Sequence, residues 1–438
     1  MDPFYIKAIQ LLLSLSLLIV LHELGHFIPA KLFKTRVEKF YLFFDLKFSL
    51  FKKKIGETVY GIGWLPLGGY VKISGMIDES MDKEQMAKPP QPWEFRSKPA
   101  WQRLIIMLGG VTVNIILGFV IYMMILLVFG RDYVKPESLS NGFTVAEPLK
   151  AYGFEDGDNF LSVDGEALEN PMNINEVFML RDFEKVEVQH ADGSIEVLQV
   201  PEDVGVELFK AGYQIPFTPV FEAKLDSIVP ESPAGLAGLQ PGDQVIGVNG
   251  EPVQFWHELT SVVKNSVGQE LLIKYQRDNA IDSVKVSVPK EAVIGIYVDA
   301  NLERGHRDYS FTESLVGGFS FGMRQLTNYA AQFKYIFTEK GASQVGGFGA
   351  IGGLFPDTWD WVSFWETTAF ISIILAFMNI LPIPALDGGH VMFLLYEMVS
   401  GRKPNEKVME YAQMIGFFII IALVLYANGN DVYRYFFE

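Results

Sequence analysis

The stretch "IQLLLSLSLLIVLHELGHFIPAK", residues 9–31, joins a long apolar run to a His-Glu-x-x-His pattern. A helix of about 20 apolar residues can cross the hydrocarbon core of a membrane, so the run predicts a membrane-spanning helix. On a helix, His22 and His26 share one face, and their imidazoles can bind a single cation. Glu23, beside the first histidine, can accept a proton from a water that this cation activates. The stretch therefore predicts two metal ligands and a catalytic base within a membrane helix.

Two other interpretations of this segment are less favourable. If the pattern were an accident within a membrane anchor, an uncompensated His-Glu-His cluster in lipid would cost several kcal/mol. A cleavable signal peptide would have a stronger positive flank than Lys7 alone, and no small-x-small cleavage site follows the apolar run. We therefore expect residues 1–30 to be retained as the first transmembrane helix.

The composition indicates a membrane protein with a separate water-exposed part. Of 438 residues, 49% are hydrophobic, yet the formal net charge is −16, and a single globule would hardly need both extremes. The chain has no cysteine, so disulfides are excluded and any metal site must use nitrogen and oxygen ligands. No pattern indicates a phosphate loop or a nucleic-acid surface, and we expect no nucleic-acid partner.

Three further apolar stretches predict the remaining spans, at residues 103–129, 364–398 and 409–427. Residues 31–103 hold 14 Lys and Arg against 8 Asp and Glu, which favours the cytoplasmic side for this loop. Residues 137–308 hold 30 acidic and 12 basic side chains and are expected on the opposite side. The four spans then follow one alternating path, with both termini on the outer side.

A third metal ligand is predicted in "NILPIPALDGGH", residues 379–390. Asp387 is an ionisable residue within a span, and it lies at a depth similar to that of the histidines if each span is mostly helical. The alternative is that Asp387 caps a helix or faces a loop. Pro382 and Pro384 each remove a backbone donor, and a broken helix at this depth requires protein or a water-filled cavity around it. We interpret His390 as an outer-shell or structural residue.

The acidic region contains an internal repeat. "PLKAYGFEDGDNFLSVDGE" at 148–166 aligns without a gap with "PAGLAGLQPGDQVIGVNGE" at 233–251. Each copy predicts a helical turn, a Gly-Asp turn, an alternating strand and an Asp-Gly or Asn-Gly turn. The pattern resembles the core of PDZ domains, which bind extended peptides or free C-termini by strand addition. Two small α+β domains are therefore expected, over about 130–215 and 216–300.

Three other segments have weaker signals. Residues 56–76 alternate apolar and small side chains and predict a β-hairpin that dips into the membrane; a soluble hairpin is the alternative. Residues 309–337 predict an amphipathic helix on the outer leaflet, followed by a glycine-rich connector at 344–355.

Taken together, these motifs resemble the site-2 protease family of intramembrane zinc metalloproteases, in its bacterial RseP type. The resemblance rests on HELGH in the first span, "PLGGYVK" at 66–72, "FRSKPAWQR" at 95–103, the PDZ-like pair and "NILPIPALDGGH", in this order along nearly the whole chain. It departs from the family in the second span, where "GGVTVN" at 109–114 keeps Asn114 but lacks the frequent proline. Phe348 likewise stands where a proline is frequent in the connector.

The resemblance implies a role for each site residue. By position, His22, His26 and Asp387 would be zinc ligands and Glu23 the catalytic acid and base. Substrate would be bound by Asn379 and by hairpin residues, namely Gly68, Gly69 and Tyr70. For Asn379 the alternative is a hydrogen bond between helices.

The resemblance also implies the architecture: a multi-pass α-helical protein of the bacterial inner membrane with four transmembrane helices, two periplasmic PDZ-like α+β domains and a membrane-associated β-hairpin. The predicted segments are 1–30, 31–102, 103–129, 130–215, 216–300, 301–363, 364–398 and 399–438. The active site would lie toward the cytoplasmic side.

The expected function is regulated intramembrane proteolysis in a stress response. By resemblance, the substrates are transmembrane anti-sigma factors already trimmed by a first, site-1-type protease, and remnant signal peptides. The PDZ-like pair would either bind a newly formed C-terminus or exclude bulky ectodomains. The rival hypothesis is a catalytically inactive PDZ scaffold in the membrane.

Overall fold

A computed structural model describes residues 2–66, 68–76, 89–168, 170–300 and 302–437. Leu67, within the predicted hairpin, and residues 77–88 of the predicted cytoplasmic loop lie outside the described residues. The chain forms two compact units, residues 1–130 with 308–438 and residues 131–307. We describe each unit by itself.

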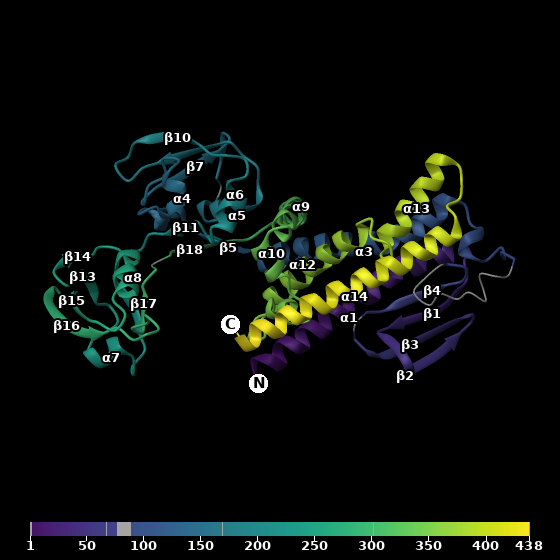
Figure 1. The fold of residues 1–438 in the computed structure, drawn as a ribbon, viewed down its shortest axis with the longest axis horizontal. Helices are drawn as coiled ribbons and strands as arrows, with labels where there is room; N and C mark the ends of the chain where they lie inside the picture. Colours follow the sequence, from purple (N-terminus) through teal and green to yellow (C-terminus); the bar gives the residue numbers. More distant parts are fainter. Residues whose placement is uncertain (1, 67, 77–88, 169, 301, 438) are drawn as a thin grey trace. The chain divides into compact units, whose positions relative to one another are not determined.

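Four helices of the first unit are long and apolar enough to cross a membrane (Figure 1). They are α1 (Pro3–Leu32), α3 (Ala100–Phe129), α12 (Trp361–Ile380) and α14 (Glu406–Phe437). Many large apolar side chains of α1 and α14 are exposed, as expected of surfaces that face lipid. The prediction of a multi-pass helical membrane protein is confirmed.

The segment predicted as one span at 364–398 contains two helices. Helix α12 ends at Ile380, and α13 (Asp387–Ser400) begins after a non-helical segment at 381–386. Pro382 and Pro384 lie in this segment and supply no backbone donor, which explains why the helix cannot continue. The break makes Asp387 the first residue of a helix rather than an interior one.

Helices α1 and α3 pack closely because glycines meet at their crossing. A Cβ atom on Gly109 would lie only 1.9 Å from the carbonyl oxygen of Gly25, so any larger residue would force the helices apart. Small residues at a helix crossing allow this approach in membranes. The crossing brings the middle of α3 against the turn of α1 that carries the histidines.

A four-stranded sheet packs on α1 in the order β2-β3-β1-β4 (Figure 1). Its strands are β1 (Val37–Leu42), β2 (Phe44–Ile55), β3 (Thr58–Leu65) and β4 (Tyr70–Ile73). The predicted hairpin at 56–76 is wrong in its pairing: β3 pairs with β2 and β1, and β4 pairs with β1. The hairpin is β2–β3. The segment 44–55 ends in "KKKI", and these consecutive charged residues are the reason that the sequence did not predict a strand there.

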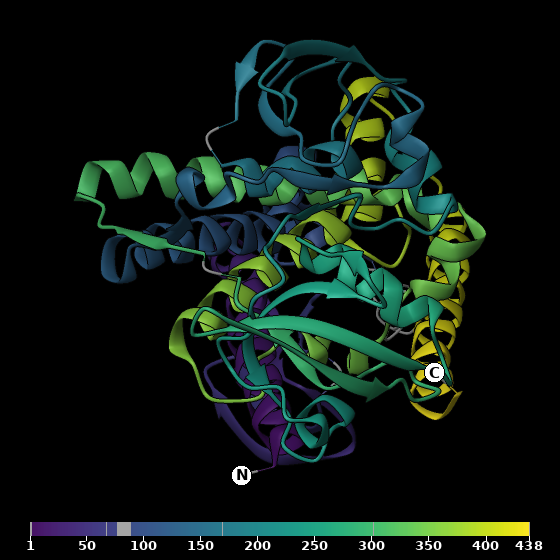
Figure 2. The same ribbon diagram turned by 90° about the vertical axis from the view of Figure 1, so that its left-hand side faces the viewer.

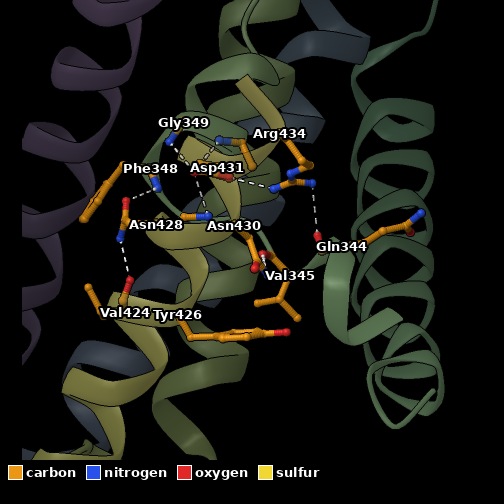
Figure 3. A network of polar contacts seen from close by, with 12 residues as sticks. Gln344, Val345, Phe348, Gly349, Val424, Tyr426, Asn428, Asn430, Asp431 and Arg434 are labelled. Carbon is orange, nitrogen blue, oxygen red and sulfur yellow. Dashed lines mark hydrogen bonds and ion pairs between the residues drawn. The ribbon is translucent and has the colours of Figure 1, made fainter. Parts of the chain in front are cut away.

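The other helices of this unit surround the bundle. Helix α9 (Phe311–Ile336) corresponds to the segment predicted as an amphipathic helix, and it packs on α3 and α12. Two shorter elements of this unit are η1 (Phe95–Ser97) and α10 (Glu339–Gln344). The glycine-rich connector forms α11 (Phe348–Gly353), whose first N–H groups are bound by α14 (Figure 3). Asp431 Oδ2 accepts from the N–H groups of Gly347, Gly349 and Ala350 at 2.9–3.2 Å, and Asp431 Oδ1 pairs with Arg434.

The second unit contains the predicted duplication. Its first module has a sheet in the order β10-β9-β7-β8, and its second module has the order β14-β13-β15-β16, so the two topologies are the same. The long β15–β16 pair of the second module is visible in Figure 2. The bounds of the elements in this unit are β5 (Arg131–Val134), η2 (Pro136–Leu139), β6 (Phe143–Val145), α4 (Glu147–Lys150), β7 (Asn159–Val163), β8 (Glu166–Ala167), η3 (Pro171–Asn173), α5 (Ile174–Leu180), β9 (Lys185–Gln189), β10 (Ile195–Gln199), α6 (Val204–Lys210), β11 (Phe217–Pro219), β12 (Leu225–Ile228), α7 (Pro233–Ala237), β13 (Gln244–Val248), β14 (Glu251–Pro252), α8 (Trp256–Asn265), β15 (Glu270–Arg277), β16 (Ala280–Ser287), β17 (Ile296–Val298) and β18 (Arg304–Arg307).

Each module has a buried aspartate in its Gly-Asp turn, but the two aspartates pair with different residues. Asp158 and Asp243 are both 0% exposed. Each Oδ2 accepts the backbone N–H three residues earlier in the chain, at 2.9 and 2.8 Å. In the first module Asp158 pairs with His190 at 2.7 Å, whereas in the second Asp243 pairs with Arg277 at 2.6 Å. Only the first pair contains a group that titrates near neutral pH.

Candidate metal centre

Three candidate ligands come together from two helices. His22 and His26 lie one turn apart on α1, and Asp387 begins α13. The break between α12 and α13 lets the Asp387 carboxylate approach both imidazoles. These three side chains form a group whose ligand atoms lie within 4.8 Å of one another.

The ligand atoms form an almost equilateral triangle. The two Nε2 atoms are 3.2 Å apart, and Asp387 Oδ2 is 3.3 Å from each of them. For metal–ligand bonds of about 2.0–2.2 Å, two corners of a tetrahedron are about 3.3–3.6 Å apart. The triangle therefore has the dimensions of one face of a tetrahedral zinc site.

The surroundings of the triangle also fit a cation. Asp387 Oδ2 is buried, and no hydrogen bond to it is found within the described part of the chain. Gly110 of α3 leaves room beside the imidazoles: a Cβ atom there would lie 2.4 Å from His26 Nε2 and 2.8 Å from His22 Nε2. Two imidazoles and one carboxylate are a donor set that zinc accepts.

Each histidine is held through its other ring nitrogen. His26 Nδ1 lies 2.8 Å from the carbonyl oxygen of Ile106, and His22 Nδ1 lies 3.2 Å from Asn114 Nδ2. Both partners belong to α3, which follows from the close crossing of α1 and α3. Such outer partners fix the ring orientation of metal-binding histidines.

The triangle opens into a cavity of about 560 Å³. Glu23, Gly69 and Tyr70 line this cavity together with the three candidate ligands, whereas Asn379 and Gly68 are not among the described residues that line it. Tyr70 is also part of the sheet, because its ring stacks on Tyr41 and its hydroxyl donates to Asp45 Oδ1 at 2.8 Å.

Glu23 lies where β4 begins. A Cβ atom on Gly69 would be 3.6 Å from Glu23 Cγ, so the start of the strand passes directly beside this side chain. The cavity thus has a carboxylate, the candidate ligands and a strand edge on its walls.

His390 is buried next to the same cavity, and its Nε2 lies 2.6 Å from Gln413 Nε2 of α14. It is not one of the three grouped ligands. Sequence reasoning did not find Ile106, Gly110 or Gln413. Gly110 and Asn114 belong to the "GGVTVN" motif, which was the available signal.

Comparison with known proteins places this geometry in a family. The profile of Peptidase family M50 matches residues 10–423. The chain is 27% identical to the regulator of sigma-E protease RseP of Escherichia coli, over 97% of each chain. It is also 27% identical to the regulator of sigma E protease of Haemophilus influenzae, over 97% of this chain and 98% of the relative. Because the family profile spans most of the chain and the three candidate metal ligands lie together, this protein belongs to peptidase family M50, a family of zinc metalloproteases, and resembles its RseP-type site-2 proteases.

Proposed function

We propose that this protein is an intramembrane endopeptidase that hydrolyses peptide bonds within transmembrane segments of single-pass membrane proteins. The observation that carries the proposal is the metal-sized triangle built from two helices of a multi-pass membrane bundle. Neither a membrane anchor nor a scaffold needs such a triangle.

In this proposal, His22, His26 and Asp387 hold the zinc ion. When bound, zinc acts as a Lewis acid that polarises a carbonyl oxygen and makes water more acidic. Glu23 accepts the proton of the attacking water as general base, and it then donates that proton to the leaving amine nitrogen as general acid. Glu23 suits this role because it lines the cavity beside the ligands without being part of the triangle.

Water must reach the scissile bond, since hydrolysis consumes it. The cavity of about 560 Å³ provides that space. Its wall includes the non-helical residues Ala385 and Leu386, and irregular backbone at membrane depth requires protein or water around it.

The substrate helix must unwind before cleavage, because its backbone hydrogen bonds shield the amide. We propose that the unwound segment adds to the edge of β4, which is the last strand of its sheet and borders the cavity. Gly68, Gly69 and Tyr70 would then position the substrate backbone. Asn379, half-buried at the end of α12, would contribute an amide hydrogen bond to the substrate.

We further propose a location in the bacterial inner membrane, with the active site toward the cytoplasm and the PDZ-like modules in the periplasm. The positive loop at 31–103 and the acidic region at 137–308 support this orientation. The names of the relatives, regulators of sigma E, support an anti-sigma factor as substrate after a first protease has trimmed it. Remnant signal peptides share the required single span and are proposed as a second substrate.

The test compares Glu23→Gln with the wild type in proteoliposomes that contain a single-span substrate. We expect Glu23→Gln to keep one zinc per chain and to lose cleavage by about 10²–10⁴-fold, the usual contribution of a general base. Glu339→Gln, at an exposed glutamate of α10, is the matched control and should cleave normally. Undiminished cleavage by Glu23→Gln would remove the proposed mechanism. Wild-type protein that lacks both zinc and cleavage would favour the PDZ scaffold.

A further inference from the structure

Asn114 is a fully buried polar residue of α3 whose role the proposed mechanism leaves open. Its side-chain amide lies 3.2 Å from His22 Nδ1, and its Oδ1 is buried without a hydrogen-bond partner among the described residues. We propose that Asn114 is a positioning residue that selects the tautomer of His22 required for metal binding. This inference rests on the proposed zinc site.

His26 shows what the site requires of a histidine. A carbonyl oxygen can only accept, so the contact with Ile106 means that His26 Nδ1 carries the hydrogen and donates it. In the neutral ring, Nε2 then has a free lone pair, and this is the atom that belongs to the triangle. The outer hydrogen bond therefore prepares His26 to ligate through Nε2.

His22 needs the same tautomer, because its Nε2 also belongs to the triangle. Its Nδ1–H must then be donated to an acceptor, and Asn114 is the group in contact with Nδ1. A half-turn of the amide exchanges its oxygen and nitrogen and directs Oδ1 at the ring. Oδ1 would then accept from Nδ1–H and leave the Nε2 lone pair facing the metal position.

The opposite amide orientation is incompatible with a metal. If Nδ2 donates to Nδ1, the neutral ring carries its hydrogen on Nε2, inside a triangle whose sides are 3.2–3.3 Å. Either orientation leaves one polar group of the Asn114 amide without a partner within the described chain, so the number of hydrogen bonds does not decide between them. The orientation is decided by His22, which must carry its hydrogen on Nδ1 to bind a metal through Nε2.

The neighbouring helix holds Asn114 in place. Ser372 Oγ of α12 donates to the backbone carbonyl of Asn114 at 2.7 Å. This bond involves the main chain and leaves the amide to His22. It also supplies a control, since Ser372→Ala removes a buried hydrogen bond at the same residue without touching the amide.

The experiment measures zinc affinity of the purified full-length protein by competition with a chelator, together with the visible spectrum of the Co²⁺-loaded form. Asn114→Leu removes the acceptor at similar volume and should weaken zinc binding by about 10–100-fold, the usual cost of losing an outer partner. Asn114→Asp keeps an acceptor and should bind zinc within about threefold of the wild type, with the wild-type Co²⁺ spectrum. Ser372→Ala should also bind like the wild type.

A purely structural role predicts a different pattern, in which Asn114→Asp is as damaging as Asn114→Leu. A second measurement does not depend on how Asp is tolerated: at saturating Co²⁺, the visible spectrum of Asn114→Leu should differ from that of the wild type, whereas the spectrum of Ser372→Ala should not. Wild-type affinity in Asn114→Leu, or equal losses in the Leu and Asp variants, would overturn this inference alone. Absence of zinc from the wild type would instead overturn the proposed function.

Discussion

Gly110→Ala tests how tightly α3 is fitted around the proposed metal ligands. The added Cβ would lie 2.4 Å from His26 Nε2 and 2.6 Å from His22 Cε1, where ordinary contacts begin at 3.4 Å. Both imidazoles must therefore move by about 0.8–1 Å, several times the tolerance of about 0.2 Å for a metal–ligand distance. Because the clash involves side chains that can rotate, we expect the protein to fold and the zinc affinity to fall by more than about 100-fold.

The assay is zinc stoichiometry and chelator competition on the detergent-purified chain, with circular dichroism to verify folding. Gly353→Ala is the control, since no atom lies within 4 Å of the Cβ that it adds to α11. The control should bind zinc like the wild type. If Gly110→Ala is folded and holds zinc with wild-type affinity, the imidazoles are not where the proposed site requires them.

Two further predictions concern other parts of the chain. The hydrogen bond and charge of Asp158 raise the pKa of His190, and burial raises the pKa of the Asp158 carboxyl. Three other acidic residues also lie near the His190 ring, namely Glu196, Glu155 and Asp192. Both shifts favour proton binding by the folded state. The contribution of His190 to the stability of the first module should therefore be fully present below about pH 6.5 and be lost as the pH rises through the raised pKa of His190. Hydrogen exchange, corrected for its intrinsic pH dependence, should show that protection of β9 falls as the pH rises. Protection of the matching strand β15 should not fall, because Arg277 stays charged. Equal losses of protection in both strands would contradict this prediction. Asp431→Ala should lower the free energy of unfolding by about 1–3 kcal/mol, because it leaves three N–H groups of the 347–350 segment without their acceptor, and Asp431→Asn should cost less; an unchanged thermal midpoint would show that α14 does not stabilise α11 in this way.

The helices and the duplication could be predicted because their signals are local. Apolar runs of spanning length indicated the four long helices, and Pro382 and Pro384 indicated the broken backbone before Asp387. The offset of 85 residues between the two copies also holds outside the quoted motifs. Strands β7 and β13 begin at Asn159 and Gln244, and strands β9 and β15 begin at Lys185 and Glu270.

The sheet order could not be predicted in the same way. Strand periodicity shows that a segment is extended, but it does not show which strand lies beside it. The parallel β1–β3 pair separates β3 from β4, so the two segments read as a hairpin are not neighbours. Strand β2 was concealed by Lys52, Lys53 and Lys54, whose charges are unusual in a sheet next to a membrane bundle.

The two histidines were predicted from their spacing and Asp387 from its depth within a span, but the residues around these ligands were not predicted. His22 and His26 are four residues apart, so a helix alone brings them together. Their outer partners lie far away along the chain: 92 residues separate His22 from Asn114, and 80 separate His26 from Ile106. Such contacts are determined by how α1 crosses α3, which depends on the glycines at the crossing rather than on any local pattern.

The central claim is that two imidazoles of α1 and one carboxylate of α13 bind a single zinc ion within the membrane bundle. The most direct measurement is zinc stoichiometry combined with X-ray absorption spectroscopy at the zinc edge, on wild type and Asp387→Ala. We expect one zinc per wild-type chain with two imidazole nitrogens and an oxygen at about 2.0–2.2 Å, and a loss of zinc from Asp387→Ala. A wild-type zinc without two imidazole ligands, or an unchanged spectrum in Asp387→Ala, would contradict the account.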